Sequence, residues 1–256
     1  MSHLLGLTEP PRYMRPEPDT AVPAVPRCLY CTRIDRPFTS EEHIIPEGLG
    51  NKTLVLPRGV VCDPCNNGPL SVLDQDFLDF GPVAMMRTFR GVPTKQGKHP
   101  KARFGNATLS QVGPSSVFLE TNSRKAARPI PGGVRLNLIG GKRMTEAYVA
   151  QLVRWVFKAA LGCIYIARGR AVAFSPQFDE TRRIVLGDGF HGYLVSLKRN
   201  RPHESVHFTH LEFQVGGRTS VWAMADVFGV SIATDLLVRR ARYFRFDRKV
   251  IDVHEF

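Results

Sequence analysis

Two identical Cys-x-x-Cys pairs, separated by 30 residues, constrain this chain more than any other feature. The pairs are Cys28/Cys31 and Cys62/Cys65. Each pair can present two thiolates from one tight turn, and four thiolates suit the tetrahedral coordination of Zn²⁺ in closed structural sites. In a reducing compartment such pairs favour a metal over a disulfide. The sequence therefore predicts a structural Zn²⁺ site within residues 27–82.

Polar residues beside the cysteines suit phosphodiester hydrolysis. Glu42 and His43 lie between the two pairs, and Asn66 directly follows the second pair. Hydrolysis needs a base that deprotonates water, and the ordinary pKa of histidine suits that task near neutral pH. It also needs a cation beside the phosphate, and Mg²⁺ and Mn²⁺ prefer carboxylate and amide oxygens as ligands. These three residues offer those parts.

The order CLYC, EHIIPEGLGN, VCDPCNN resembles the HNH endonuclease family, in particular its zinc-stapled members with two CxxC pairs. The resemblance covers about residues 27–80. It implies a ββα-metal module, in which a β-hairpin and a helix surround a catalytic Mg²⁺ or Mn²⁺, with other divalent ions as alternatives. It also implies that Glu42 is a ligand of that cation, His43 the general base and Asn66 a second ligand.

Two details of this resemblance leave alternatives open. The family's middle asparagine falls just before the second CxxC pair, where this chain reads VLPRGVV, so Asn51 is a candidate substitute. Adjacent residues on a regular strand point to opposite faces, so Glu41 is the reserve candidate for the carboxylate beside His43. The family's helix is expected here from about Pro69 to Phe80.

The net charge of +12 is unevenly distributed. Residues 1–80 carry 7 basic and 11 acidic side chains, whereas residues 81–256 carry 28 and 12. Between Phe80 and Thr145 there are twelve basic residues and one acid, and a second basic cluster covers residues 239–249. A surface with mostly basic side chains binds phosphates favourably, so this distribution indicates a nucleic-acid partner. DNA is the predicted partner, and RNA stays an alternative.

The remaining patterns predict an α+β fold with three parts: a disordered proline-rich tail (1–26), the nuclease-like module (27–82) and a larger basic α+β domain for nucleic-acid binding or target selection (83–256). Residues 81–115 look like a basic loop or hairpin connection. A helix is expected from Thr145 to near Gly162 or a turn later, with Lys158 on its polar face. A second helix is expected at 176–186, closed by Gly187, and strands are expected at 116–121, 134–139 and 229–238.

These observations predict a metal-dependent DNA endonuclease. A zinc-stabilised nucleic-acid-binding protein without catalysis is the alternative, because it would also explain the cysteines and the charge. A protein-interaction module is the third option. No apolar run long enough to span a membrane stands out, so we expect a cytoplasmic protein, with homodimerisation as an option.

Overall fold

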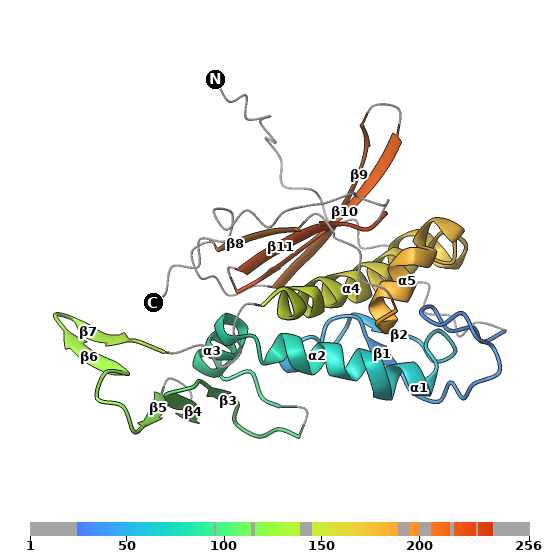
Figure 1. Cartoon of the computed structure of the whole chain (residues 1–256). Helices are drawn as coiled ribbons and strands as arrows, with labels where there is room; N and C mark the ends of the chain where they lie inside the picture. Colours follow the sequence, from blue (N-terminus) through green and yellow to red (C-terminus); the bar gives the residue numbers. More distant parts are fainter. Residues whose placement is uncertain are drawn as a thin grey trace.

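A computed structural model of the protein describes residues 25–94, 96–113, 116–138, 145–188, 195–199, 206–215, 218–228 and 230–237. The elements form layers, and the long helix α4 (Glu146–Ala173) lies in the middle (Figure 1). One side of α4 packs on an antiparallel sheet of strand order β8-β11-β10-β9, and the other side packs on α2 (Ser71–Leu78). The four strands of the sheet are β8 (Val195–Arg199), β9 (Val206–Val215), β10 (Arg218–Val227) and β11 (Val230–Asp235).

The cysteine segment folds as a hairpin followed by a helix, which confirms the α+β class. Strands β1 (Glu42–His43) and β2 (Val55–Leu56) pair antiparallel, with His43 opposite Val55. The short helix α1 (Asp63–Cys65) leads through a wide helical turn, η2 (Asn66–Leu70), into α2. Gly68 is non-helical within that turn, so the regular helix begins at Ser71 rather than at Pro69.

The segment expected to be a basic loop or hairpin connection contains a helix as well as paired strands. Helix α3 (Gly81–Arg90) begins at a Gly-Pro pair and ends at Gly91, whose positive φ suits a residue without a side chain. Then follow the three-stranded sheet β3 (Lys101–Arg103), β4 (Ala107–Gly113) and β5 (Ser116–Thr121), and the hairpin β6 (Ala127–Ile130) with β7 (Gly133–Leu136).

Helix α4 begins where the sequence predicts and ends later than expected. The Thr145 side chain accepts a hydrogen bond from the Tyr148 amide as an N-cap, and the helix continues past Gly162. Gly169 is non-helical, so the last residues up to Ala173 lie beyond a kink. Its stretch from Ala147 to Ala173 is long and apolar enough to cross a membrane, which the sequence analysis did not recognise. In its most apolar window 78% is buried inside the protein, as in a core helix. Helix α5 (Asp179–Leu186) follows and ends at Gly187 as predicted.

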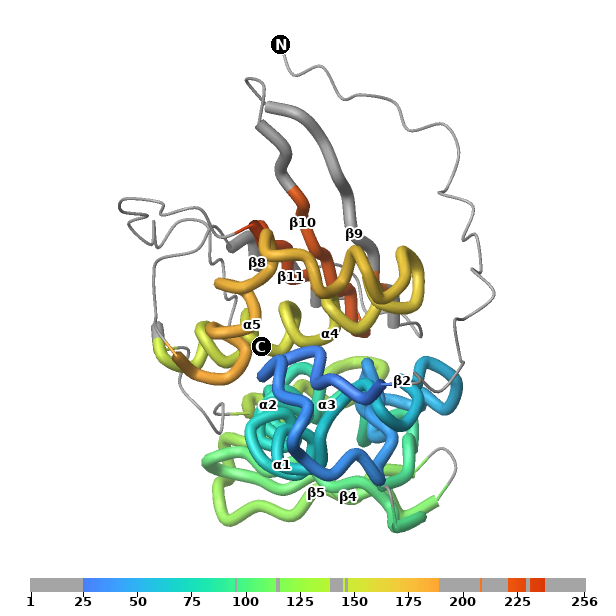
Figure 2. The backbone as a smooth tube through the Cα atoms, turned by 90° about the vertical axis from the view of Figure 1, so that its right-hand side faces the viewer, coloured from blue at the N-terminus to red at the C-terminus, as the bar shows by residue number. Residues whose placement is uncertain are grey.

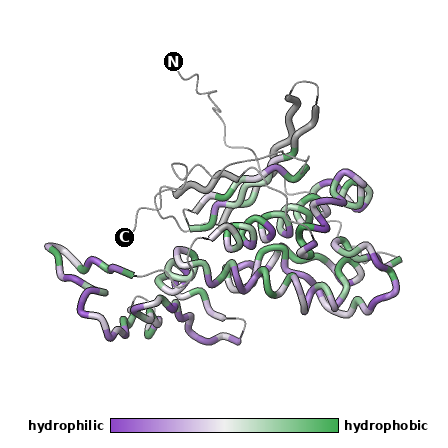
Figure 3. Tube along the Cα trace, viewed as in Figure 1, coloured by the Kyte–Doolittle hydropathy of each residue, from purple (hydrophilic) through white to green (hydrophobic). Residues whose placement is uncertain are grey.

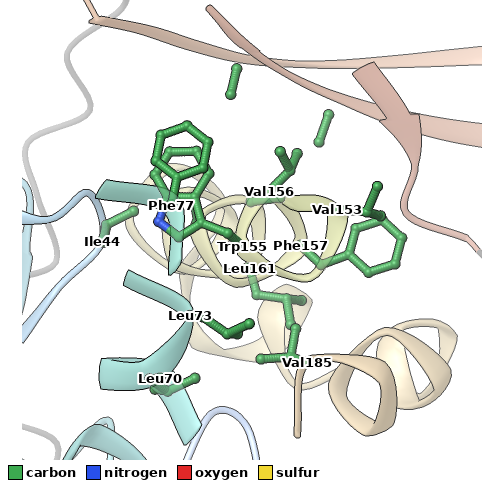
Figure 4. Packing of buried hydrophobic residues seen from close by; sticks show 14 of the residues in the cluster. Ile44, Leu70, Leu73, Phe77, Val153, Trp155, Val156, Phe157, Leu161 and Val185 are labelled. Carbon is green, nitrogen blue, oxygen red and sulfur yellow. The ribbon is translucent and has the colours of Figure 1, made fainter. Parts of the chain in front are cut away.

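A single hydrophobic cluster includes residues from Cys28 to Leu237. Helix α4 lies between the sheet and the cysteine segment (Figure 2), and it carries many of the hydrophobic residues of the cluster (Figure 3). At its centre the Phe77 ring of α2 stacks on the Trp155 ring of α4, with ring centroids 3.5 Å apart (Figure 4). The two predicted domains 27–82 and 83–256 therefore share one core, and their independence stays a prediction. The proposed tail up to residue 24 and the basic cluster 239–249 lie outside the described residues.

Candidate functional site

The four predicted zinc ligands converge. The sulfur atoms of Cys28, Cys31, Cys62 and Cys65 all lie within 4.8 Å of one another, and the Cys31 and Cys62 sulfurs are 3.6 Å apart. Four sulfurs that share one zinc ion at about 2.3 Å lie about 3.8 Å from each other in a tetrahedron. The donor set and its spacing therefore fit structural Zn²⁺.

The thiols influence one another strongly. A hydrogen bond from Cys65 lowers the pKa of Cys28 to about 5, whereas burial raises the pKa of Cys62 to about 12. One thiolate forms easily, and each further negative charge in the same buried space is disfavoured. A divalent cation would remove that penalty, because it neutralises the thiolates it binds.

Asp63 joins the cysteine cluster to the strand that carries His43. Its carboxylate accepts hydrogen bonds from the amide and hydroxyl groups of both Thr39 and Ser40, at 2.6–3.2 Å. Hydrogen bonds from Ser40 and Thr39 hold the pKa of Asp63 at about 2, so it is ionised at neutral pH. Because Asp63 lies within the second CxxC pair, a metal there would also fix the start of β1.

Asn66 lies against the same strand. Its amide nitrogen donates to the main-chain oxygen of Glu41 at 2.9 Å and to Ser40 Oγ at 3.0 Å. Glu41 precedes His43 by two residues, so the amide of Asn66 is anchored beside the strand of the histidine. With the nitrogen used in these contacts, the amide oxygen is the atom that a cation would bind.

The two candidate carboxylates have opposite surroundings. The Glu41 side chain is 56% exposed, and its Oε1 is 3.8 Å from Arg58 Nε. The Glu42 side chain is only 3% exposed, and its Oε1 is 2.5 Å from the ammonium of Lys158. His43, the next residue on the strand, is half-buried.

Lys158, which helical periodicity placed on the polar face of its helix, contacts the strand that carries His43. It is fully buried, and its ammonium donates to both carboxylate oxygens of Asp74, at 2.8 and 2.9 Å, and to the main-chain oxygen of His43 at 2.8 Å. Burial lowers the pKa of Lys158, but attraction to Asp74 and Glu42 outweighs this and holds the pKa above its ordinary value. The amine is therefore charged, and it links α4 to α2 and β1.

Further contacts tie the cysteine segment to the C-terminal helices. The Tyr30 hydroxyl donates to the main-chain oxygen of Lys158 at 3.0 Å. The guanidinium of Arg182, buried on α5, donates to the main-chain oxygen of Leu29 at 3.0 Å. No local sequence motif marks these residues, so these contacts could not be predicted from the sequence.

Asn51 holds the loop between β1 and β2. Its amide nitrogen donates to the oxygens of Ile45 and Leu54, and its amide oxygen accepts from the amides of Thr53 and Leu54. These hydrogen bonds brace the loop, and a substitution for the family's middle asparagine stays a prediction.

Comparisons with known proteins agree with this geometry. Residues 28–79 match the model of a protein family described as HNH endonuclease, which is about a fifth of the chain. The resemblance found in the sequence is confirmed for this segment. No curated protein and no solved structure is detectably similar to the chain.

Proposed function

We propose that this protein is a metal-dependent endonuclease that hydrolyses phosphodiester bonds of DNA, with His43 as the general base. The observation that carries the proposal is the contact of Asn66 with the main chain two residues before His43, inside a segment that matches the HNH endonuclease model. A protein in which zinc only stabilises the fold would not need the Asn66 amide against the strand that carries His43.

The proposed catalytic cation would be Mg²⁺ or Mn²⁺, which would neutralise charge on the phosphate and on the departing oxygen. The oxygen of the Asn66 amide is proposed as one ligand. Of the two carboxylates, the exposure of Glu41 supports it as the other ligand, because Glu42 is buried and already paired with Lys158. The proposed ligand is therefore Glu41, the reserve candidate from the sequence, and no longer Glu42.

The base and three supporting residues would then have separate roles in the reaction. The neutral imidazole of His43 takes a proton from the attacking water. Lys158 holds the main-chain oxygen of His43, Asn51 braces the loop after it, and Asp63 fixes the residues before it. Such support limits movement of the base relative to the phosphate, and misplacement of a reacting group is costly for the rate.

The test is plasmid cleavage by the zinc-loaded full chain with Mg²⁺ or Mn²⁺. His43→Ala should lower the rate by about 10²–10⁴-fold, the usual contribution of a general base. Asn66→Ala should also lower it, whereas Asn67→Ala at the exposed neighbouring position is the matched control. Equal cleavage by His43→Ala and wild-type protein would refute the assignment of the base. DNA binding without any cleavage by the wild type would favour the zinc-stabilised binding protein instead.

A comparison of Glu41→Gln with Glu42→Gln tests the choice of carboxylate. We expect Glu41→Gln to raise the Mn²⁺ concentration needed for half-maximal cleavage without changing the melting temperature. Glu42→Gln should mainly lower the melting temperature, because it weakens a buried ion pair. The reverse pattern would return Glu42 to the role of ligand.

A further inference from the structure

The hairpin of β6 and β7, the β6–β7 ribbon, has features that its own fold does not explain. It extends away from the body of the protein beyond α3 (Figure 1). None of its residues is buried: Arg128, Pro129, Ile130, Val134 and Arg135 are all exposed. A two-stranded hairpin without a packed face is at best marginally stable in water.

The base of the ribbon is nevertheless held firmly. The Asn106 side chain donates to the main-chain oxygen of Asn137 at 2.8 Å, and the Asn137 side chain donates to that of Lys125 at 3.1 Å. The Asn137 amide donates to the oxygen of Ala126, which is fully buried. The first contact joins the ribbon to Asn106, directly before β4, and the other two close the base of the ribbon, so the ribbon is presented in a defined direction rather than as a loose loop.

Like charges face each other in the middle of the ribbon. Arg128 lies directly opposite Arg135 in the register, so their side chains share one face. Like charges at such a position destabilise a hairpin. Among the described residues, no carboxylate forms an ion pair with either arginine. Arg124 and Lys125 are exposed just before the ribbon, and Glu120 is the one acid among residues 81–145. An anionic partner between the two arginines would attract both of them and offset their repulsion.

The dimensions suit the groove of duplex DNA. A two-stranded ribbon fits the major groove of B-form DNA, which is about 12 Å wide, whereas the major groove of A-form RNA is deep and too narrow for it. The two-residue turn Pro131–Gly132 keeps the tip slender, and a side chain at Gly132 would meet no atom within 4 Å. Pro129 has no amide hydrogen to donate, which discourages a third strand from pairing with the ribbon.

We propose that the β6–β7 ribbon is an arm that enters the major groove of duplex DNA, with Arg128 and Arg135 directed at phosphates or base edges. The inference deepens the proposed nuclease function, since it assigns B-form duplex DNA as the substrate class and names the surface that grips it. RNA and single-stranded DNA are alternatives that the experiment separates.

The test compares the wild-type full chain, zinc-loaded, with Arg128→Gln/Arg135→Gln. The matched control is Arg33→Gln/Arg183→Gln, which removes two exposed arginines from other elements. Binding to a duplex DNA, an A-form duplex RNA and a single-stranded DNA is measured without divalent cations across a range of salt concentrations. The ribbon variant should bind duplex DNA at least about tenfold more weakly, and the slope of log K against log[salt] should fall by about 2, because each lost phosphate contact removes about 0.9.

The outcomes distinguish this proposal from the nuclease function. Unchanged duplex-DNA binding by the ribbon variant, an equal loss in the control variant, or stronger wild-type binding to RNA or single strands would overturn the ribbon proposal. Plasmid cleavage could persist in each of those cases. Ribbon-dependent DNA binding by a wild-type protein that never cleaves would leave the ribbon in place and overturn the nuclease.

Discussion

Replacing Lys158 by methionine is the perturbation whose effect the structure determines best. The substitution keeps much of the side-chain volume and removes the ammonium that contacts Glu42, Asp74 and the main-chain oxygen of His43. Two carboxylates would then remain in or near the core without their cation. Breaking a buried ion pair by removing one partner costs about 3–5 kcal/mol. That is a large part of the ~5–15 kcal/mol by which folded proteins are stable.

The expected result is a melting temperature lowered by about 6–20 °C, since 1 kcal/mol corresponds to about 2–4 °C in a chain of this size. The deficit should also depend on pH. Burial already raises the pKa of Asp74, and loss of Lys158 would raise it further above its unfolded value. A group with a raised folded pKa favours folding when protonated, so the deficit of Lys158→Met should be smallest below about pH 4 and should grow as the pH rises.

Thermal melts at several pH values, with the zinc content measured in parallel, provide the assay. The control is Lys158→Met/Glu42→Gln/Asp74→Asn, in which the orphaned charges are also removed; it should regain most of the lost stability. A melting temperature of Lys158→Met within about 2 °C of the wild type at pH 8 would refute the reasoning. If the triple variant did not regain stability, packing rather than charge would account for the lower melting temperature of Lys158→Met.

Three further outcomes are expected. Gly162→Ala should destabilise the protein, because the new Cβ would lie 2.8 Å from Ile44 Cγ1. The cost of overpacking, about 1–3 kcal/mol, exceeds the gain of about 1 kcal/mol in helix propensity. Equal or higher stability of the variant in chemical denaturation would contradict this. Cys65→Ser should abolish stoichiometric zinc binding measured by metal analysis, while Cys163→Ser should retain it; the idea fails if both bind one equivalent. Burial raises the pKa of Cys163 to about 12, so its thiolate is scarce at pH 8. Alkylation of Cys163 in the zinc-loaded protein should therefore be about 10³-fold slower at pH 8 than in the denatured chain, and it should accelerate about tenfold per pH unit. Similar alkylation rates in both states would disprove this.

Local spacing was sufficient to predict the parts of the molecule that local chemistry determines. The cysteine pairs predicted a cluster of sulfurs, which the structure contains. The N-cap at Thr145 and the helix end at Gly187 were also predictable, because capping depends on neighbouring residues. Leu70, Leu73 and Phe77, which lie at helical spacing within the helix expected from Pro69 to Phe80, are buried.

The predictions failed where a distant element decides the environment. Helical periodicity placed Lys158 on a polar face, but α4 is covered on two sides and a buried acid pair lies where solvent was expected. Alternation along β1 separated Glu41 from Glu42 without saying which one faces the core. That choice depends on a lysine 115 residues beyond His43, which no local pattern connects to it.

The contact between Arg182 and Leu29 also affects the order in which the protein matures. These residues are 153 positions apart, so the cysteine cluster, although synthesised early, gains its last support only after most of the chain has been translated. A polypeptide terminated before residue 158 would lack both this guanidinium and the Lys158 ammonium that holds the main-chain oxygen of His43. The fold thereby delays the complete support of the cysteine segment until residue 182 has been translated.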